Sequence, residues 1–319
     1  MNAVLAIGSG LALGVGLPYL GMRMLVPSLS KGRTAENYRG RQVFAGLGVA
    51  WLLWAGAAIV GGVIAAEESS ILPVLTLAGP LALVAFTLGI VDDAYGTGAD
   101  RGFKGHLRAL SKGRLTTGGL KLFGIAAASY VVAAVIASAG GWSDQLPLQL
   151  ALALPAGAAI ALTANFVNLT DLRPGRALKV YSLLGVLGVA SVVLGLGSIV
   201  DPEPLTSLVD ALTLLLFVMG PVFAVWRYDL GERGMLGDAG ANAAGAVAGM
   251  LLVAGLPIWG MLLYLAAMLA LNAASERVSF TRLIERSPFL TRLDMIGRET
   301  DGLSADGAER STTSERNPE

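Results

Sequence analysis

Residues 71–91 read ILPVLTLAGPLALVAFTLGIV, 21 positions without a charged side chain, and the next two residues are Asp92 and Asp93. A helix of roughly 20 apolar residues is long enough to cross the hydrocarbon core of a bilayer. This stretch therefore predicts a membrane-spanning helix that ends in an acidic pair.

Eight further apolar stretches lie along the chain. Apolar residues make up 54% of the 319 positions and charged residues 14%, whereas a soluble domain carries roughly 25% charged residues. The first stretch is not expected to be a cleaved signal peptide, because it lacks a basic leading segment and runs too long before its first charge. The predicted fold class is all-α, a polytopic transmembrane helical bundle of about nine spans. These are expected at about 2–28, 43–66, 71–91, 119–138, 147–165, 180–199, 205–225, 240–255 and 257–273.

Positive charge is confined to every second connection between these stretches. The connections at 67–68, 140–145 and 201–203 contain no Lys or Arg. Cytosolic loops carry the excess of Lys and Arg in membrane proteins. The distribution predicts an outside N-terminus, a cytosolic C-terminus and an odd number of spans, in the cell membrane (inner or plasma). All 23 Lys and Arg residues lie within 23–41, 101–121, 173–179, 227–233 and 277–316.

The chain divides into three parts on this pattern. In 276–298 apolar residues recur among cations, with Pro288 between two runs. That pattern predicts either two short amphipathic helices on the inner leaflet or a cap packed on the cytosolic loops. Residues 299–319 have no apolar period and are expected to be disordered. The membrane domain is 1–275, with cytosolic loops expected at 29–42, 92–118, 166–179 and 226–239.

Composition also excludes several kinds of site. The absence of cysteine excludes disulfides and thiolate metal sites, and a single histidine, His106, argues against a zinc centre or a Ser-His-Asp triad. The cations lie at the membrane face without aromatic interleaving, so a nucleic-acid partner has no support. The glycine-rich pieces match neither a Walker A loop nor a dinucleotide fingerprint.

Acidic residues and amides gather at three helix ends on the predicted cytosolic side. An Asp at a helix C-terminus opposes the macrodipole, and adjacent carboxylates repel each other unless a cation lies nearby. Mg²⁺ prefers oxygen ligands and takes one or two carboxylates together with substrate phosphates, so the pattern predicts a magnesium site. The three clusters are Asp92-Asp93 after the third span, Asn165-Phe-Val-Asn168-Leu-Thr-Asp171 after the fifth, and Gly237-Asp238-Ala-Gly240 before the eighth.

Each of these features also has a plainer interpretation. An acidic pair at a membrane boundary can be a solvated helix end, Asp238 can be the N-cap of its helix, and Asn168 can satisfy backbone groups. The nearby cations suit phosphate groups at the inner leaflet, but positive-inside topology and anionic lipids account for many of them. These cations are Lys104, Arg108, Lys112, Arg114, Lys121, Arg173, Arg176 and Lys179.

The three motifs, in this order, resemble the polyprenyl-phosphate N-acetylhexosamine-1-phosphate transferase family (glycosyltransferase family 4 type), which includes phospho-N-acetylmuramoyl-pentapeptide transferase. That family has an Asp-Asp pair at a helix end, then Asn-x-x-Asn-x-x-Asp, then Gly-Asp-x-Gly. The resemblance covers roughly residues 10–275. It implies Mg²⁺-dependent transfer of a sugar-1-phosphate from a UDP-sugar to a polyprenyl phosphate such as undecaprenyl phosphate, with release of UMP, in cell-envelope glycan synthesis.

The resemblance also implies a role for individual residues. By position, metal contacts, catalytic carboxylates and substrate contacts of the family have counterparts here. The expected metal contacts are Asp238 and Asn168, the carboxylates are Asp92, Asp93 and Asp171, and the substrate contacts are Lys121, Asn165, Arg173 and Lys104. The implied partners are a polyprenyl phosphate lipid, a UDP-sugar and the lipid bilayer, with a homodimer left open.

Three features depart from the family pattern. Family members continue Asp-Gly-x-Asp-Gly after the second Asn, whereas Pro174 stands here in place of the second Asp, which the family places near the nucleotide. Ala241 follows Gly-Asp-x-Gly where Ser is usual. The histidine-rich loop and tenth helix of the pentapeptide-transferring branch have no counterpart, so a cell-envelope sugar other than the peptidoglycan pentapeptide substrate is expected.

Two other functions are compatible with parts of the sequence. A non-catalytic descendant that binds polyprenyl phosphates, or regulates an envelope enzyme, is favoured by Pro174. A transporter is disfavoured because no charged residue lies near the middle of a predicted span, where ionisable groups mark transport pathways; Asp210 lies near an outer end. The sequence leaves open the sugar, the polyprenol length, and whether transfer is direct or passes through a phosphorylated Asp.

Overall fold

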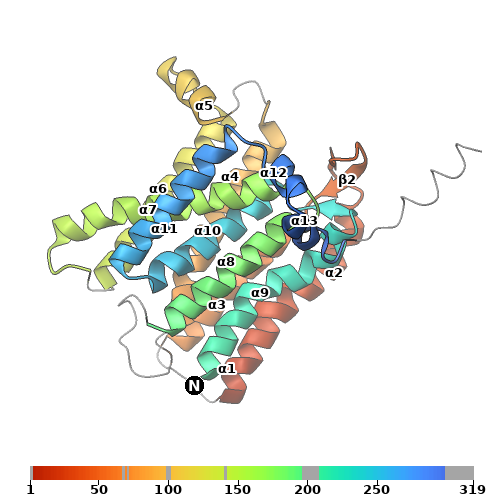
Figure 1. The fold of residues 1–319 in the computed structure, drawn as a ribbon. Helices are drawn as coiled ribbons and strands as arrows, with labels where there is room; N and C mark the ends of the chain where they lie inside the picture. Colours follow the sequence, from red (N-terminus) through yellow and green to blue (C-terminus); the bar gives the residue numbers. More distant parts are fainter. Residues whose placement is uncertain are drawn as a thin grey trace, which may run out of the picture.

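The chain folds into a bundle of long helices with one small sheet at one end (Figure 1). The computed structural model describes residues 3–66, 69, 72–97, 102–139, 142–195 and 208–298. Eight helices in these ranges are long and apolar enough to cross a membrane, and α3 (Val49–Ala65) is apolar but shorter, at 17 residues. The predicted all-α polytopic bundle is therefore confirmed, while the count of nine crossings and the orientation stay predictions.

The first span is one continuous helix in three parts. α1 (Ala3–Ser9) and α2 (Leu17–Leu29) are joined by a π-helical segment (Gly10–Gly16). A Cβ at Gly14 would lie 2.8 Å from the Cα of Phe217 in α9, so this glycine permits the close contact of the two helices. The other long helices are α4 (Leu75–Tyr95), α6 (Thr117–Ala139), α7 (Leu146–Thr170), α8 (Arg176–Val193), α9 (Leu208–Leu230), α10 (Gly237–Gly255) and α11 (Ile258–Ser275).

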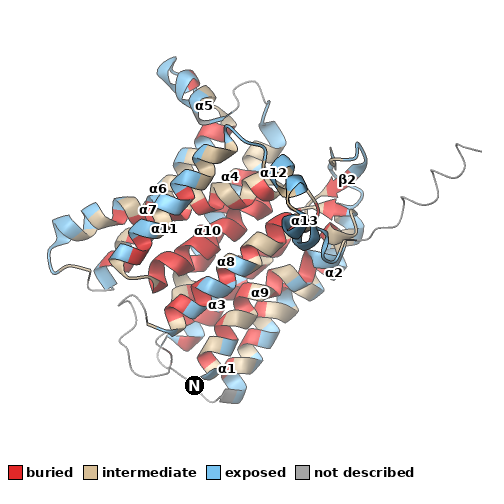
Figure 2. Cartoon of the chain, in the orientation of Figure 1, coloured by how far each residue is buried: buried red, intermediate tan, exposed pale blue. Residues whose placement is uncertain are grey.

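α10 lies at the centre of the bundle and is buried along nearly its whole length (Figure 2). Its sequence is dominated by Gly and Ala, which let helix backbones approach closely in a membrane. A Cβ at Gly89 of α4 would lie 2.5 Å from the Cα of Ala239, and one at Gly245 would lie 2.6 Å from the Cα of Ala164 in α7. This packing holds the ends of α4, α7 and α10 next to one another.

The sheet differs from what the hydropathy pattern predicts. β2 (Gln42–Ala45) pairs antiparallel with β1 (Thr34–Glu36) and parallel with β3 (Gly234–Met235). The predicted span 43–66 therefore begins too early, and α3 starts only at Val49. The β-branched and aromatic residues of β2 favour a strand. Gly48, which follows β2, permits close contact with α10, because a Cβ at this position would lie 2.5 Å from the backbone N of Gly240.

Several helices extend further into the predicted loops than expected. α4 continues past the acidic pair to Tyr95, because neither Gly nor Pro lies between Asp93 and Gly96. The predicted loop 92–118 also contains α5 (Gly102–Ser111), which projects from the end of the bundle (Figure 1). α7 reaches Thr170 and α9 reaches Leu230, so the connections that carry the candidate site are short.

Two short helices follow α11, matching the two apolar runs of 276–298. They are α12 (Phe280–Arg286) and α13 (Pro288–Met295). The hydroxyl of Ser279 accepts a hydrogen bond from a backbone N–H in the first turn of α12, and the hydroxyl of Ser287 does the same for α13. Proline at the first helical position costs no hydrogen bond, which fits the start of α13. The predicted tail 299–319 and the connection 201–203 lie outside the described residues.

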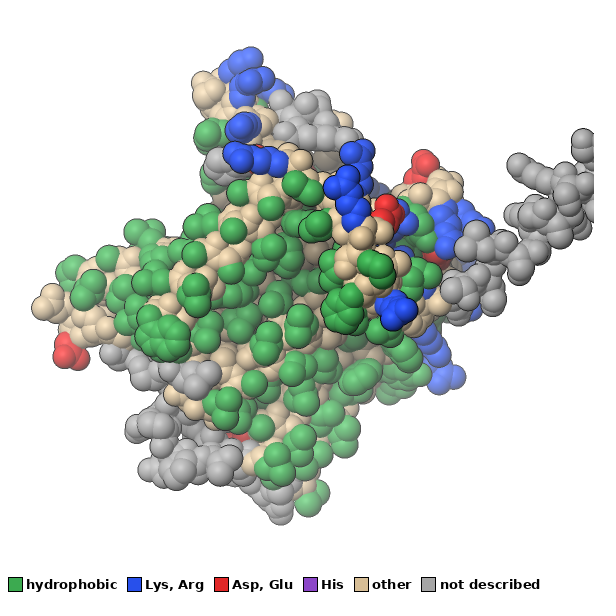
Figure 3. Space-filling model, viewed as in Figure 1, with side chains coloured by type: hydrophobic (Ala, Val, Ile, Leu, Met, Phe, Trp, Pro, Cys, Tyr) green, Lys and Arg blue, Asp and Glu red, His purple; other side chains and the backbone are tan. Residues whose placement is uncertain are grey.

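The outer surface of the bundle is apolar over the flank shown in Figure 3, whereas Lys and Arg gather at the end that carries α5, the sheet and α12. Large side chains such as Leu11, Val63, Val131 and Leu263 are exposed on the helices of the bundle. An apolar surface of this extent is not left in water by a monomeric soluble protein. Together with the eight long apolar helices, it indicates a multi-pass membrane protein in a lipid bilayer.

Candidate active site at the helix ends

Lys121 lies between carboxylates from two of the predicted motifs. Its Nζ is 2.7 Å from Oδ2 of Asp92, at the end of α4, and it also donates a hydrogen bond to Oδ2 of Asp238, in the first turn of α10. The three side chains are largely shielded, with exposed fractions of 13%, 17% and 29% for Lys121, Asp92 and Asp238. An ion pair with little water around it is strong, so the ammonium group fixes the two carboxylates relative to each other.

The N-terminus of α10 is covered by two further carboxylates. Asp93 accepts hydrogen bonds from the backbone N–H groups of Asp238 (3.3 Å) and Ala239 (3.1 Å). Asp171, which follows the last residue of α7, accepts one from the backbone N–H of Gly237 at 3.0 Å. The free N–H groups and the macrodipole at a helix N-terminus favour anionic groups. Asp238 itself lies within the first turn of α10, not at the N-cap, which is Leu236.

Two glycines make this arrangement sterically feasible. Gly237 has φ of +68°, in the left-handed region that favours glycine. A Cβ at Gly237 would also lie 2.9 Å from Oδ2 of Asp93. A Cβ at Gly240 would lie 2.6 Å from the Cα of Gly48, so the last glycine of the motif serves helix packing. The spacing Gly-Asp-x-Gly thus has a local structural cause in addition to any chemical one.

A cavity of about 400 Å³ opens beside this cluster. It lies between the sheet, the connection from α7 to α8, the end of α9 and α12, and Asp171 belongs to both the cavity lining and the cluster. Its volume is in the range of small-molecule sites. Other lining residues include Tyr38, Arg173, Pro174, Asp229, Glu232 and Thr281.

The cavity is more acidic than its single lining cation can balance. Burial raises the pKa of Asp171 well above its ordinary value, the charges of Asp229, Asp238 and Asp93 raise it further, and the N–H of Gly237 partly offsets them. A phosphate group placed beside Asp171 therefore needs an additional positive charge between them.

Arg173, predicted as a substrate contact, does lie at the cavity. Its guanidinium group stacks on the ring of Tyr38, 4.2 Å from the centroid, and its Nη2 is 3.1 Å from Oε1 of Glu285 in α12. Tyr38 is held in turn by Glu232, whose Oε1 accepts its hydroxyl at 2.9 Å and also lies 3.2 Å from Nη2 of Arg39. Glu232 has φ of +52°, which is strained for a residue with a side chain. Its contacts with Tyr38 and Arg39, in the hairpin formed by β1 and β2, hold it in place.

Three other predicted residues are not brought into the cluster. The Asn165 amide donates to Oδ1 of Asn272 in α11 at 2.7 Å, so it joins α7 to α11. Asn168 is half-buried, and its side chain makes no hydrogen bond within the described part of the chain. Lys104 is exposed on α5.

The structure adds Asp229 to the residues around the cavity. It is 3% exposed, in the last turn of α9, and its Oδ2 accepts the backbone N–H of Gly175 at 2.7 Å. The sequence carried a signal for it, because a carboxylate near the membrane end of a span, within a cationic segment, resembles the three clusters that were singled out. Tyr38 and Glu232 gave no such signal. Tyr38 lies between β1 and β2 and Glu232 follows α9, and only the fold brings these two segments together.

The carboxylates fit a cation, although the side chains supply few ligands by themselves. Among the residues that the structure describes, no group of three or more His, Cys, Asp or Glu could hold a metal ion. Oδ2 of Asp92 and Oδ2 of Asp238 nevertheless converge on one positive charge, the ammonium of Lys121. Mg²⁺ commonly takes only one or two carboxylates and completes its shell with water and substrate phosphates. Asp92 and Asp238 are therefore the side chains that could supply these carboxylates.

Comparison with known proteins adds no further constraint: no protein-family model matches the chain, and neither does any curated protein.

Proposed function

We propose that this protein transfers a sugar-1-phosphate from a UDP-sugar to a polyprenyl phosphate such as undecaprenyl phosphate, with Mg²⁺, and releases UMP. The proposal includes the resemblance to the polyprenyl-phosphate N-acetylhexosamine-1-phosphate transferase family as a divergent branch. It also includes nine spans, an outside N-terminus and an active face on the cytosolic side of the cell membrane. A role in cell-envelope glycan synthesis belongs to the same hypothesis, which leaves a homodimer open.

One observation supports this function above the others. Three side chains from the ends of three different helices meet at one point: Lys121, Asp92 and Asp238. Asp93 and Asp171 lie beside them, at the N-terminus of α10. Phosphoryl transfer is catalysed mainly by positioning and charge neutralisation. A cluster of this kind, at the end of membrane-spanning helices, suits a reaction between a lipid phosphate and a soluble diphosphate.

The geometry suggests where each substrate lies. The lipid phosphate would bind at Lys121, which lies near the start of α6 at the predicted membrane boundary. The UDP-sugar would occupy the cavity, with its diphosphate toward Asp171 and its planar base near Tyr38 and Arg173. Pro174 also lines this cavity, so the departure from the family pattern falls on the donor side.

The chemical step needs little proton transfer. A phosphate monoester has a second pKa of about 6, so the attacking oxygen of the lipid phosphate is already mostly deprotonated at neutral pH. That oxygen forms a bond to the β-phosphorus of the UDP-sugar, and the bond from this phosphorus to the bridging oxygen breaks, releasing UMP. Lys121 would hold the attacking phosphate, and Asp92 would orient Lys121 by their 2.7 Å ion pair.

Mg²⁺, when bound, would neutralise charge on the diphosphate, and Asp92 and Asp238 are the side chains that would hold it. Asn168 remains a proposed further contact on the strength of its motif position alone. The predicted substrate roles of Lys104 and Asn165 have the same basis, whereas Arg173 has the additional support of its place at the cavity.

The decisive experiment measures UMP release by purified protein with undecaprenyl phosphate, Mg²⁺ and a panel of UDP-sugars. Lipid- and metal-dependent release that disappears in Asp238→Asn supports the transferase and identifies the sugar. Asp144→Asn is the matched control, because Asp144 is an exposed carboxylate in the connection between α6 and α7, at the opposite ends of these helices from the cluster.

A non-catalytic lipid-binding protein is the second candidate. It is favoured by the compact Lys121 ion pairs, which hold the two carboxylates together without a metal, and by Pro174. Folded protein that binds polyprenyl phosphate but releases no UMP from any donor would establish this alternative.

The proposed role of Asp92 has its own test in the pH dependence of turnover. If Asp92 organises the metal and Lys121, Asp92→Asn weakens the Mg²⁺ dependence and leaves the acid limb of the pH–rate profile unchanged. Loss of the acid limb alone would instead identify Asp92 as a general base.

A further inference from the structure

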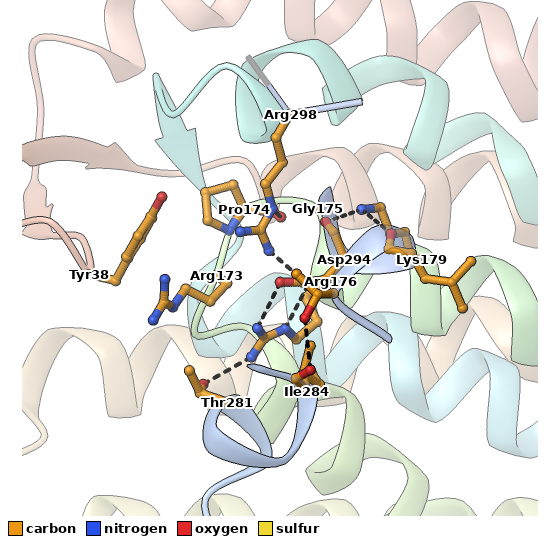
Figure 4. A network of polar contacts seen from close by, with 12 residues as sticks. Tyr38, Arg173, Pro174, Gly175, Arg176, Lys179, Thr281, Ile284, Asp294 and Arg298 are labelled. Carbon is orange, nitrogen blue, oxygen red and sulfur yellow. Dashed lines mark hydrogen bonds and ion pairs between the residues drawn. The ribbon is translucent and has the colours of Figure 1, made fainter. Parts of the chain in front are cut away.

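The cap formed by α12 and α13 is fixed to the bundle by its polar side (Figure 4). Arg176, at the start of α8, donates from Nε and Nη2 to the two carboxylate oxygens of Asp294, each at 3.0 Å. Nη2 of Arg298 lies 2.8 Å from the same carboxylate, and its Nε donates to the carbonyl of Pro174 at 2.9 Å. Lys179 donates to the Asp294 carbonyl at 2.6 Å. Bidentate Arg–carboxylate pairs are geometrically specific, so the orientation of the cap is defined.

The opposite side of the cap is apolar and exposed. Leu283 is 50% exposed, Phe289 68% and Ile296 60%. Along α13 the helical period places Phe289 on a different side from Asp294, and Figure 3 shows hydrophobic side chains continuing from the region of α12 and α13 onto the flank of the bundle. Within the described residues, the apolar side of the cap is thus continuous with the surface that faces lipid.

Arginines alternate with these apolar residues along the chain. Each is exposed, and none forms a salt bridge or a side-chain hydrogen bond in the ranges that the structure describes. Their charge contrasts with the cap's inner side, where every cation is paired. The four residues are Arg277, Arg282, Arg286 and Arg292.

We propose that the cap docks on the bilayer surface through this side, with Leu283, Phe289 and Ile296 below the headgroups and the four arginines on anionic phospholipids. Apolar residues flanked by cations are the pattern of interfacial helices, and Lys and Arg near an anionic membrane surface are attracted to it. The polar network holds the cap at the membrane boundary, where α8 begins, so the apolar side can reach the bilayer without a change of fold.

Docking also bears on the cavity, because α12 supplies part of its wall. Thr281 lines the cavity, and its hydroxyl accepts a hydrogen bond from Nη1 of Arg176 at 3.0 Å. Glu285 forms an ion pair with Arg173, which also lines the cavity. A cap seated on anionic lipid therefore holds this wall in place. The proposal does not depend on which ligand the cavity takes.

The test uses the absence of cysteine in the chain, which makes single-cysteine labelling specific. Phe289→Cys and Glu285→Cys carry the same environment-sensitive fluorophore in nanodiscs of zwitterionic lipid alone or with phosphatidylglycerol, each containing spin-labelled lipid as quencher. The Phe289 probe should be quenched strongly, and more in the anionic discs, whereas the Glu285 probe, on the other side of α12, should not. Equal quenching of the two probes, or no dependence on phosphatidylglycerol, overturns the proposal.

Charge variants separate lipid contact from other causes. Arg282→Glu, Arg286→Glu and Arg292→Glu in one chain should lower the quenching of the Phe289 probe several-fold, while the three Arg→Lys changes should retain it. Neither set touches the Arg176–Asp294 network, so the cap stays folded. Energy transfer between donor- and acceptor-labelled chains in one disc, without lipid quenching, would assign the apolar side to a second copy and refute the bilayer contact.

Discussion

Two ionic clusters lie at the same end of the molecule with opposite balances of charge. At the candidate site one cation, Lys121, is shared by Asp92 and Asp238, and further carboxylates lie close by. In the cap one carboxylate, Asp294, is shared by Arg176 and Arg298. The first cluster has acid in excess and the second has base in excess.

This difference separates a binding site from a structural joint. Excess carboxylates are costly to keep together without water, and the proposed metal–phosphate substrate would relieve their repulsion by adding a cation. The guanidinium groups around Asp294 instead have further partners within the chain, since Arg176 donates to Thr281 and Arg298 to the carbonyl of Pro174. Under the proposed function the first cluster binds a ligand, whereas the second joins two parts of the folded chain.

The largest expected effect follows from removing the shared cation of the site. Lys121→Met should lower UMP release at least ~100-fold, the magnitude found when a positioned charge or donor is removed from a reaction centre. Lys179→Met, which removes a lysine from the cap contacts, should change turnover less than threefold. Similar losses in both variants would show that the two clusters do not differ in function.

Gly237→Ala should have the next largest effect. Its φ of +68° costs an L-residue about 1–2 kcal/mol, and the new Cβ would displace Oδ2 of Asp93. We expect about a tenfold or larger loss of turnover from the misplaced carboxylate, together with a Tm lower by a few degrees. Gly56→Ala in α3 is the control, because a Cβ there meets nothing within 4 Å. A Gly237→Ala protein with full activity would contradict the role of the Asp93 contact.

The difference between the clusters also marks what sequence reasoning reaches. Asp92-Asp93, Asp171 and Gly237-Asp238 were predictable because each sits at the end of a long apolar stretch, where helix length fixes its depth. That Lys121 would pair with two of them was not, since charge patterning places a lysine on a side of the membrane but not beside a particular carboxylate. The Arg176–Asp294 joint was likewise beyond prediction, because 118 residues separate its members.

The short strands show a second limit. Val43 and Phe44 are apolar and adjoin the α3 stretch, so a hydropathy window merges them with it. Their backbone instead pairs with Gly234 and Met235, far along the chain. Asn165 shows a third limit. Its place near the end of α7 predicted that it would join the carboxylate cluster, but its amide donates to Asn272 of α11 instead.

In the cap, Asp294→Asn should loosen α13 without affecting the site. Burial raises the pKa of Asp294, but hydrogen bonds from Arg176 and the charges of Arg176, Arg298 and Lys179 outweigh it, so the pKa lies below its ordinary value. The stabilisation is then present above pH about 4 and is lost as pH falls through the lower folded pKa.

Hydrogen exchange of the α13 amides measures this loosening. Wild-type protection should be constant above pH about 5 and fall in more acidic buffer, after correction for intrinsic exchange. In Asp294→Asn, protection should be about tenfold lower at neutral pH, equivalent to about 1.4 kcal/mol, and independent of pH in the acidic range. Glu285→Gln, whose side chain is exposed, should change it by no more than about twofold. Unchanged protection in Asp294→Asn would remove the basis for treating the cap as a joint.

The smallest effect concerns the boundary of the site. A double-mutant cycle with Asn165→Ala and Asn272→Ala should give a coupling energy of about 0.6 kcal/mol, typical of hydrogen bonds between helices in a membrane. Because Asn165 donates to Asn272 and not to the carboxylate cluster, both single variants should leave turnover within about twofold. Asn272→Ala should lower stability more than Asn165→Ala, since Asn272 also donates to the carbonyls of Leu162 and Met268. Unfolding in mixed micelles gives the first quantity and UMP release the second. A large loss of turnover in Asn165→Ala alone would return this residue to the substrate contacts that its motif predicts, since Asn272→Ala removes the same hydrogen bond while keeping the Asn165 side chain.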